Sequence, residues 1–253
     1  CAAELEKLIL AQGPDTIAAF IGEPALGTGG LVPPPEGYWQ AIQPVLKKYD
    51  ILLIADEVVT GFGRLGSMFG STHYGIEPDL ITIAKGLTSA YAPLSGSIVS
   101  EEVWKILEQG TDEIGPMGHG WTYSAHPIGA AAGIASLRVV DELDLVSNAG
   151  EVGAHLKQSL LNAIGEHPNV GEIRGEGLLV AVEFVADRTT RKFFDPVGKV
   201  GPPVAAEMLN LGGIARGMPQ GDILGIAPPL CLSVDEADIL VEATTQAVES
   251  VLG

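Results

Sequence analysis

Four short apolar runs in the first hundred residues constrain the fold of this chain most strongly. They cover residues 16–22, 51–56, 80–84 and 95–99. The first three show little alternation of polar and apolar residues, which is typical of strands buried on both faces of a mostly parallel sheet. Between the first two runs, residues 37–48 place apolar side chains such as Trp39, Ile42 and Leu46 at helical spacing. The alternation of strand and helix therefore predicts an α/β fold built from βαβ units.

The pattern changes near Asp141. The elements predicted around and after it are helices at 126–145 and 151–164, strands at 170–174 and 178–184, a helix ending near residue 211, and short strands near Ile214 and Ile223. The last helix opens with Ser233 and Glu236, whose spacing is typical of a capping box. We therefore expect two domains: residues 1–140 as part of a large domain, and residues 141–253 as a small α+β C-terminal domain.

Charge and cysteine content exclude several classes of partner. The chain has 32 acidic and 14 basic residues, a net charge of -18. Such a field repels phosphate backbones and anionic lipid, so we expect neither nucleic acid nor a membrane surface as a partner. No run approaches the ~20 apolar residues of a membrane span, and the first residues lack the pattern of a signal peptide. Cys1 and Cys231 form no CxxC or metal-binding pattern, so we expect a cytoplasmic protein without a metal site.

Two of the predicted strands end in a residue that can do chemistry. Asp56 ends the second run, and Lys85 follows the third. The carboxyl ends of parallel strands meet at one edge of a sheet, where α/β folds bind ligands. Pyridoxal phosphate requires such a pair, a lysine for its aldehyde and an acid for its pyridinium nitrogen. Taken singly, Asp56 is at least as well explained by an ordinary acid at a strand end, and Lys85 is better explained by a solvated lysine after a strand.

A different ligand is also compatible with the second run. Four apolar residues before Asp56 and Glu57 resemble the magnesium-binding strand of phosphate-loop ATPases. That interpretation requires a GxxxxGK[ST] loop. No such loop is present, because no lysine follows the glycines of residues 27–30.

Several longer motifs resemble those of one enzyme family. Residues 55–64, Ala-Asp-Glu-Val-Val-Thr-Gly-Phe-Gly-Arg, followed by Lys85 are similar to the signature of the class III (omega-amino-acid) aminotransferases, which depend on pyridoxal 5'-phosphate. The other matching segments, in the family's order, are residues 22–30, 121–127, 174–178 and 227–230. The resemblance covers essentially the whole chain. It implies the second half of a fold-type I large domain, residues 1–140, followed by the small domain.

The resemblance also implies roles for particular residues. Lys85 would form the Schiff base with the cofactor and then act as general base and acid, and Asp56 would pair with the pyridine nitrogen. Val58 would pack against one face of the ring, and Glu23 would lie near the cofactor or substrate. Thr122 would reach the phosphate of the cofactor bound mainly by the other subunit of a homodimer. Packing or turn formation remains the alternative for Glu23, Val58 and Thr122.

The substrates implied are an amine and a 2-oxo acid. Ornithine-type members carry an arginine just before Ala-Pro-Pro, and here Gly225 occupies that position. Arg216 lies nine residues earlier, which resembles the omega-amine:pyruvate members, whose mobile arginine binds a carboxylate or swings away from an apolar group. A surface arginine in a glycine-rich loop is an equally good interpretation of Arg216.

The chain departs from the family in its length. The family has nearly as much sequence again before the position of Cys1, including a Gly/Ser-rich helix start that binds the cofactor phosphate. Since the first residue is Cys rather than Met, we expect this chain to be the C-terminal part of a longer protein. A non-catalytic module with a structural or dimerisation role remains the alternative function.

Overall fold

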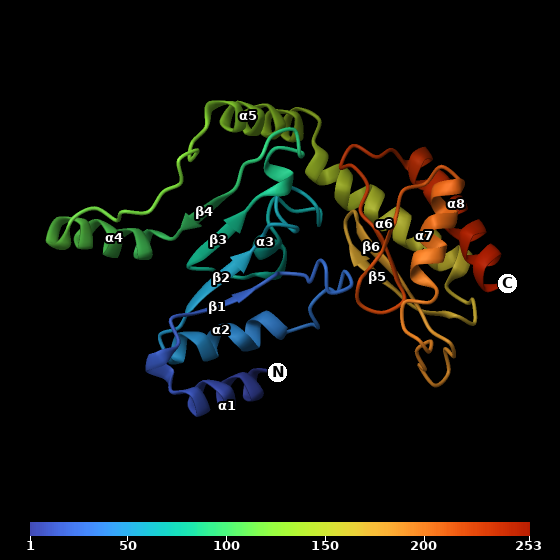
Figure 1. Ribbon diagram of the computed structural model, residues 1–253, viewed down its shortest axis with the longest axis horizontal. Helices are drawn as coiled ribbons and strands as arrows, with labels where there is room; N and C mark the ends of the chain where they lie inside the picture. The colour runs from blue at the N-terminus through green and yellow to red at the C-terminus, as the bar shows by residue number, and fades with distance from the viewer. The chain divides into compact units, whose positions relative to one another are not determined.

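The computed structural model describes residues 1–253 and divides into two compact units, which are described separately (Figure 1). The first unit comprises Cys1–Pro24, Pro34–Phe62 and Phe69–Glu142, and the second comprises Ala25–Pro33, Gly63–Met68 and Leu143–Gly253. The single division at residue 140 that the sequence predicts would place two short segments, Ala25–Pro33 and Gly63–Met68, in the first domain. Their contacts are with the second unit instead.

The first unit is built on a four-stranded sheet. Its strands are β1 (Ala19–Gly22), β2 (Leu52–Asp56), β3 (Leu80–Ile83) and β4 (Gly96–Val99), which lie side by side in that order. The first three strands are parallel, and β4 is antiparallel to β3. Each strand falls within one of the four apolar runs, so the predicted α/β fold with a mostly parallel sheet is confirmed.

Helices α1 (Ala2–Gln12) and α2 (Tyr38–Lys48) pack on one face of this sheet (Figure 1). Trp39 and Leu46 of α2 form a buried cluster with Leu53 of β2. Successive side chains of a strand point to opposite faces, so Ile21 and Leu52 lie on the other face, where they are 58% and 37% exposed. Within this chain, the two helices therefore cover one face of these strands and not both.

The remaining helical elements of the first unit lie before, between and after the strands. They are two 3-10 turns, η1 (Pro14–Thr16) and η2 (Lys85–Leu87), and the helices α3 (Gly70–Tyr74), α4 (Glu101–Ile114) and α5 (Pro127–Glu142). Helix α4, which was not predicted from the sequence, has no buried residue and is capped by Ser100, whose hydroxyl oxygen accepts a hydrogen bond from Val103 N. The predicted helix 126–145 ends early at Glu142. Asp144 has a positive φ of 48°, and α6 begins directly after it, at Leu145 rather than at the predicted residue 151.

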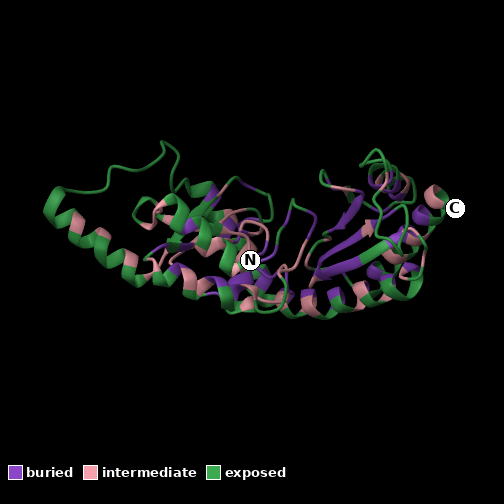
Figure 2. Cartoon of the chain, turned by 90° about the horizontal axis from the view of Figure 1, so that it is seen from below, coloured by how far each residue is buried: buried purple, intermediate pink, exposed green.

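The second unit is an antiparallel sheet covered by helices. Its elements are α6 (Leu145–Ile164), β5 (Val170–Glu176), β6 (Leu179–Phe184), α7 (Gly201–Asn210), β7 (Arg216–Gly217), β8 (Ile223–Ile226) and α8 (Val234–Leu252). The strand order is β5-β6-β8-β7, and every pairing is antiparallel. The strands β6 and β8 are almost entirely buried, as Figure 2 shows. This unit has the predicted α+β composition, and α8 begins with the predicted capping box between Ser233 and Glu236.

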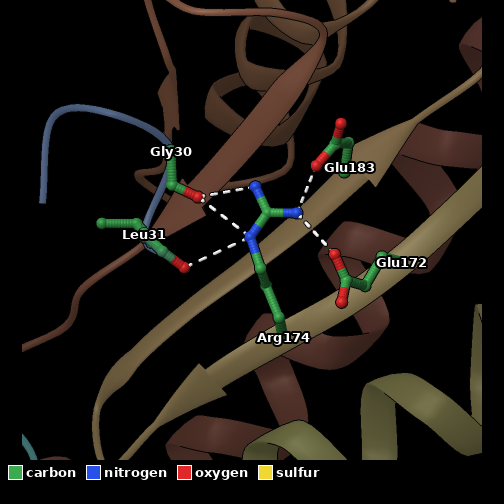
Figure 3. Close-up of polar contacts among 5 residues, drawn as sticks. All are labelled: Gly30, Leu31, Glu172, Arg174 and Glu183. Carbon is green, nitrogen blue, oxygen red and sulfur yellow. Dashed lines mark hydrogen bonds and ion pairs between the residues drawn. The ribbon is translucent and has the colours of Figure 1, made fainter. Parts of the chain in front are cut away.

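Arg174 of β5 binds the short segment Ala25–Pro33 within the second unit (Figure 3). Its Nη2 and Nε donate to the carbonyl oxygen of Gly30 at 2.7 and 3.2 Å, and Nε also donates to that of Leu31 at 3.3 Å. Its Nη1 donates to Glu172 Oε2 at 2.9 Å and to Glu183 Oε2. The guanidinium therefore uses all its nitrogens to join distant parts of the sequence.

None of the helices in the chain has the length and the apolar composition needed to cross a membrane.

Candidate active site

Asp56 lies at the carboxyl end of β2, where its carboxylate is held from one side. The parallel register pairs Asp56 with Thr82 of β3. Asp56 Oδ1 accepts hydrogen bonds from the Thr82 hydroxyl and from the Val58 backbone N–H, each at 3.1 Å. Because both donors use the same oxygen, Oδ2 has no protein donor and can accept a hydrogen bond from a ligand.

Lys85 lies at the same edge of the sheet, on the adjacent strand. It follows β3 three residues after Thr82, opens η2 with a φ of 40°, and has an exposed side chain. The next residue, Gly86, packs tightly on the loop that follows Asp56: a Cβ there would lie 3.2 Å from Phe62 Cβ and 3.5 Å from the Gly61 carbonyl oxygen. The structure therefore brings the segments that carry Asp56 and Lys85 together, as the sequence predicts.

Glu23 and Val58 belong to the same sheet edge. Glu23 follows β1, whose last residue, Gly22, pairs with Ala55 of β2, so Glu23 lies beside the end of the strand that carries Asp56. Val58 begins the turn after β2, and its side chain is half-buried. Three neighbouring strand ends thus deliver two carboxylates and an amine to one edge.

Thr122 and Arg216 are not brought to this edge by the contacts of the first unit. Thr122 lies on an exposed turn between α4 and α5, in which Trp121 N donates to Ser124 Oγ at 3.0 Å. Arg216 belongs to the second unit, where its exposed side chain stems from β7 opposite Gly225 of β8. The predicted roles of these two residues stay predictions.

Two polar residues near the predicted motif have structural contacts that the sequence did not reveal. Glu57 is 0% exposed, and both its oxygens accept hydrogen bonds. Arg64, in the second unit, donates from Nη1 to the carbonyl oxygens of Leu178 at 3.0 Å and Pro228 at 2.5 Å. Burial of the guanidinium lowers the pKa of Arg64. For Glu57, the only sequence signal is an acid next to Asp56 at the end of an apolar strand.

The chemistry of these donors and acceptors fits pyridoxal phosphate. Asp56 offers an open carboxylate oxygen to a ring N–H, and Lys85 offers an exposed amine that takes part in no ion pair. These are the two groups that the cofactor requires of a protein. His, Cys, Asp and Glu side chains form no group of three or more that could hold a metal ion.

The first unit places a lysine and an acid at neighbouring strand ends of a partly parallel sheet, and the second unit is an antiparallel α+β fold. This combination is typical of pyridoxal-phosphate enzymes. The family model of the class III aminotransferases matches residues 1–248. This chain belongs to that family.

Similar proteins agree with this assignment. The diaminobutyrate–2-oxoglutarate transaminase of Halomonas elongata is 62% identical over 251 residues, which are 99% of this chain and 54% of that protein. A probable gamma-aminobutyrate transaminase 3 of Oryza sativa subsp. indica is 42% identical, over 98% of this chain and 48% of its own length. The solved omega transaminase of Pseudomonas jessenii in complex with PMP has a TM-score of 0.95 and 42% identity, covering 99% of this chain and 55% of that structure.

A structure from work on directed evolution of transaminases by ancestral reconstruction has a TM-score of 0.97 and 64% identity, with 100% of this chain and 55% of that chain covered. The chain therefore spans about half the length of the relatives that it matches. The matched half is the C-terminal one, and the family's cofactor is pyridoxal 5'-phosphate.

Proposed function

We propose that this chain provides the cofactor-binding lysine and acid of a transaminase that moves an amino group from an amine or omega-amino acid to a 2-oxo acid. The observation that supports the proposal best is the edge shared by Asp56 and Lys85. One carboxylate oxygen there is fixed by Thr82 and Val58 while the other is open.

Each residue has a distinct task in this proposal. Pyridoxal phosphate, when bound, supplies the electron sink for the bond broken at the substrate carbon. Lys85 would hold the cofactor through its amine, and the same amine is placed to act as the base and acid that move a proton at the substrate carbon. Asp56 would accept a hydrogen bond from the ring N–H and keep that nitrogen charged, Val58 would pack against the ring, and Glu23 would lie near the cofactor or substrate.

Arg216 is proposed to bind the carboxylate of the 2-oxo acid, for which pyruvate is the first candidate. The packing around Gly225 supports this choice of cation, since a Cβ at Gly225 would lie 2.8 Å from Met218 Sδ and 3.2 Å from Leu31 Cδ1. A long side chain at position 225 would have to displace both residues. Arg216, which pairs with Gly225 in the ladder of β7 and β8, is therefore the cation that we propose for this role.

A second pair of substrates is supported by the relative from Halomonas elongata, which is named for diaminobutyrate and 2-oxoglutarate. The two candidates differ in their acceptors, because 2-oxoglutarate has a second carboxylate and pyruvate has one. Initial rates with each acceptor, measured with diaminobutyrate and with a simple arylalkyl amine as donors, distinguish them. Activity confined to diaminobutyrate and 2-oxoglutarate would reject the omega-amine:pyruvate proposal.

We also propose that the protein acts as a homodimer in which Thr122 contacts the cofactor phosphate of the partner. Its turn between α4 and α5 is exposed, which suits a role outside its own site. Mixing Thr122→Ala and Lys85→Ala proteins is expected to restore part of the activity in mixed dimers. Full activity in a monomeric species would contradict the proposal.

The central test is chemical trapping of the cofactor. Borohydride reduction of the holoprotein, followed by peptide mapping, is expected to place the adduct on Lys85 and to yield no adduct with Lys85→Ala. Lys105→Ala is the matched control, because Lys105 is an exposed lysine on α4 that pairs only with Glu101, at 3.5 Å. An adduct on any other lysine would refute the assignment.

The alternative of a non-catalytic module is tested by the absorption spectrum of the protein with its cofactor. Asp56→Asn is expected to keep a coloured cofactor complex but to lower the rate severely, because the ring nitrogen loses its charged partner. A holoprotein preparation without absorption above 400 nm, which no added pyridoxal phosphate restores, would favour the non-catalytic module.

A further inference from the structure

Glu57 is the most deeply buried acid of the first unit, and the proposed chemistry gives it no part. Its side chain is 0% exposed, and it immediately follows Asp56. Oε2 accepts hydrogen bonds from the Thr60 hydroxyl at 2.5 Å and from Gly70 N at 2.8 Å, and Oε1 accepts one from Ser71 N at 2.5 Å. The carboxylate thus joins the beginning and the end of the 57–71 loop.

The groups that Glu57 holds are packed against the segment that carries Glu23. A Cβ at Gly70 would lie 2.8 Å from Pro24 Cβ and 2.9 Å from Thr60 Cβ. Pro24 is fixed on its other side, since its carbonyl oxygen accepts a hydrogen bond from Trp39 Nε1 at 3.1 Å. The chain next to Glu23 is therefore held between Gly70 and Trp39, and displacement of Gly70 would remove one of these two supports.

The same loop is packed against the segment that carries Lys85. Gly61 N donates to the Glu57 carbonyl oxygen at 2.9 Å, which forms the turn containing Val58. Gly61 and Phe62 are the neighbours of Gly86. The segments of Glu23, Val58 and Lys85 all rest on the loop whose two ends Glu57 joins.

We propose that Glu57 is a positioning residue that fixes these three segments relative to Asp56. It acts through the loop and touches no reacting atom. The benefit of this positioning to catalysis rests on the proposed function. The positioning itself is a property of the protein without cofactor.

Glu57→Gln is the sharpest perturbation. The three donors are divided between two oxygens, and glutamine has one acceptor oxygen and a donating NH2 group. In either orientation at least one of Gly70 N and Ser71 N faces a donor and loses its partner. Thr60→Val is the milder variant, because it removes only the hydroxyl donor and leaves both backbone bonds.

Asp79→Ala is the matched control at the opposite edge of the sheet. Asp79 Oδ2 accepts a hydrogen bond from Leu53 N at 2.7 Å, and Asp79 directly precedes β3. This change removes an acid that holds a backbone N–H of the same sheet, but at the amino end of the strands.

The first measurement is amide hydrogen exchange in the cofactor-free protein. Glu57→Gln is expected to speed exchange at least about tenfold in peptides covering residues 20–24, 57–62 and 84–88. Thr60→Val should show the same pattern more weakly, and Asp79→Ala should leave these peptides unchanged. Faster exchange confined to residues 69–72, or an equal increase throughout the unit, would overturn the proposal.

The second measurement is retention of pyridoxal phosphate by the holoprotein, followed by absorption. Glu57→Gln is expected to weaken retention about tenfold and to shift the cofactor band, in contrast to Asp79→Ala. Unchanged retention and spectrum in Glu57→Gln would also overturn the proposal. If wild-type protein gives no Lys85 adduct, the proposed function fails, and the exchange experiment alone decides the positioning role.

Discussion

Replacing Arg174 by methionine tests the contacts that hold the segment 25–33 in the second unit. Methionine keeps much of the length and apolar stem of arginine but removes every donor. The change leaves the carbonyl oxygens of Gly30 and Leu31 without this partner and separates Glu183 from its cation. We expect it to be the most damaging single change of a charged residue in this unit.

The loss in free energy of unfolding expected for Arg174→Met follows from the exposure of the side chains involved. The Arg174 side chain is 9% exposed and that of Glu183 is 22% exposed, so their pair belongs to the buried class, in which loss of one partner costs about 3–5 kcal/mol. Glu172 is 60% exposed, and its share is about 0–1 kcal/mol because solvent screens the pair. For a protein of this size the sum, about 3–6 kcal/mol, corresponds to a melting temperature lowered by roughly 6–24 °C.

The assay is urea unfolding of Arg174→Met, Glu183→Gln, Glu172→Gln and the two double mutants, followed by circular dichroism. The coupling energy between Arg174 and Glu183 should be about 1–3 kcal/mol, and that between Arg174 and Glu172 should be below about 0.5 kcal/mol. A loss under about 1 kcal/mol for Arg174→Met, or a stronger coupling to Glu172 than to Glu183, would refute this reasoning.

Three further changes have defined outcomes. Gly153→Ala should destabilise by more than about 3 kcal/mol in thermal unfolding, because the new Cβ would lie 2.1 Å from the Gly177 carbonyl, whereas Gly110→Ala on α4, with nothing within 4 Å, should be neutral or stabilising. Ser233→Ala should cost about 0.5–2 kcal/mol. Because hydrogen bonds from the Ser233 backbone and hydroxyl lower the pKa of Glu236 below its usual 4.5, the Glu236 contribution is complete above that pH. It is lost as the pH falls through the lowered value, which a pH series of melting curves would detect. Arg216→Ala should weaken transition-state binding of pyruvate or alanine by about 2–5 kcal/mol and leave a simple arylalkyl amine unaffected, and equal losses in kcat/KM would show a structural role.

The elements that could be predicted from the sequence are those specified by local patterns. The strands β2 and β3 were predictable because each is a continuous apolar run, and Asp56 and Lys85 followed because parallel strands end at one edge. The helix expected across residues 126–145 ends at Glu142, two residues before Asp144, whose positive φ has no strong sequence signal. The exposed helix α4 was missed although its sequence carries an N-cap serine, Ser100, and two acidic residues in the first turn.

The contacts that remained hidden join residues far apart in the sequence. Nothing local to Gly30 indicates that its carbonyl oxygen is bound by Arg174, and nothing local to Arg64 identifies the carbonyl oxygens of Leu178 and Pro228 as its partners. The same limitation applied to Glu57, whose partners Gly70 and Ser71 lie beyond a loop. Burial and pairing of single polar groups depend on tertiary structure that a sequence pattern does not encode.

The contact between Arg174 and Gly30 has a consequence for the order in which the protein forms during synthesis. The two residues are 144 positions apart, and Arg64 and Pro228 are 164 apart. At a translation rate of about 5–20 residues per second, Gly30 is made roughly 7–30 s before the arginine that binds it. Contacts between residues so far apart in the sequence form late and slowly, because the intervening chain must first lose conformational entropy. We therefore expect the second unit to reach its native state only after nearly the whole chain has left the ribosome, with the residues around Gly30 accessible to chaperones until then.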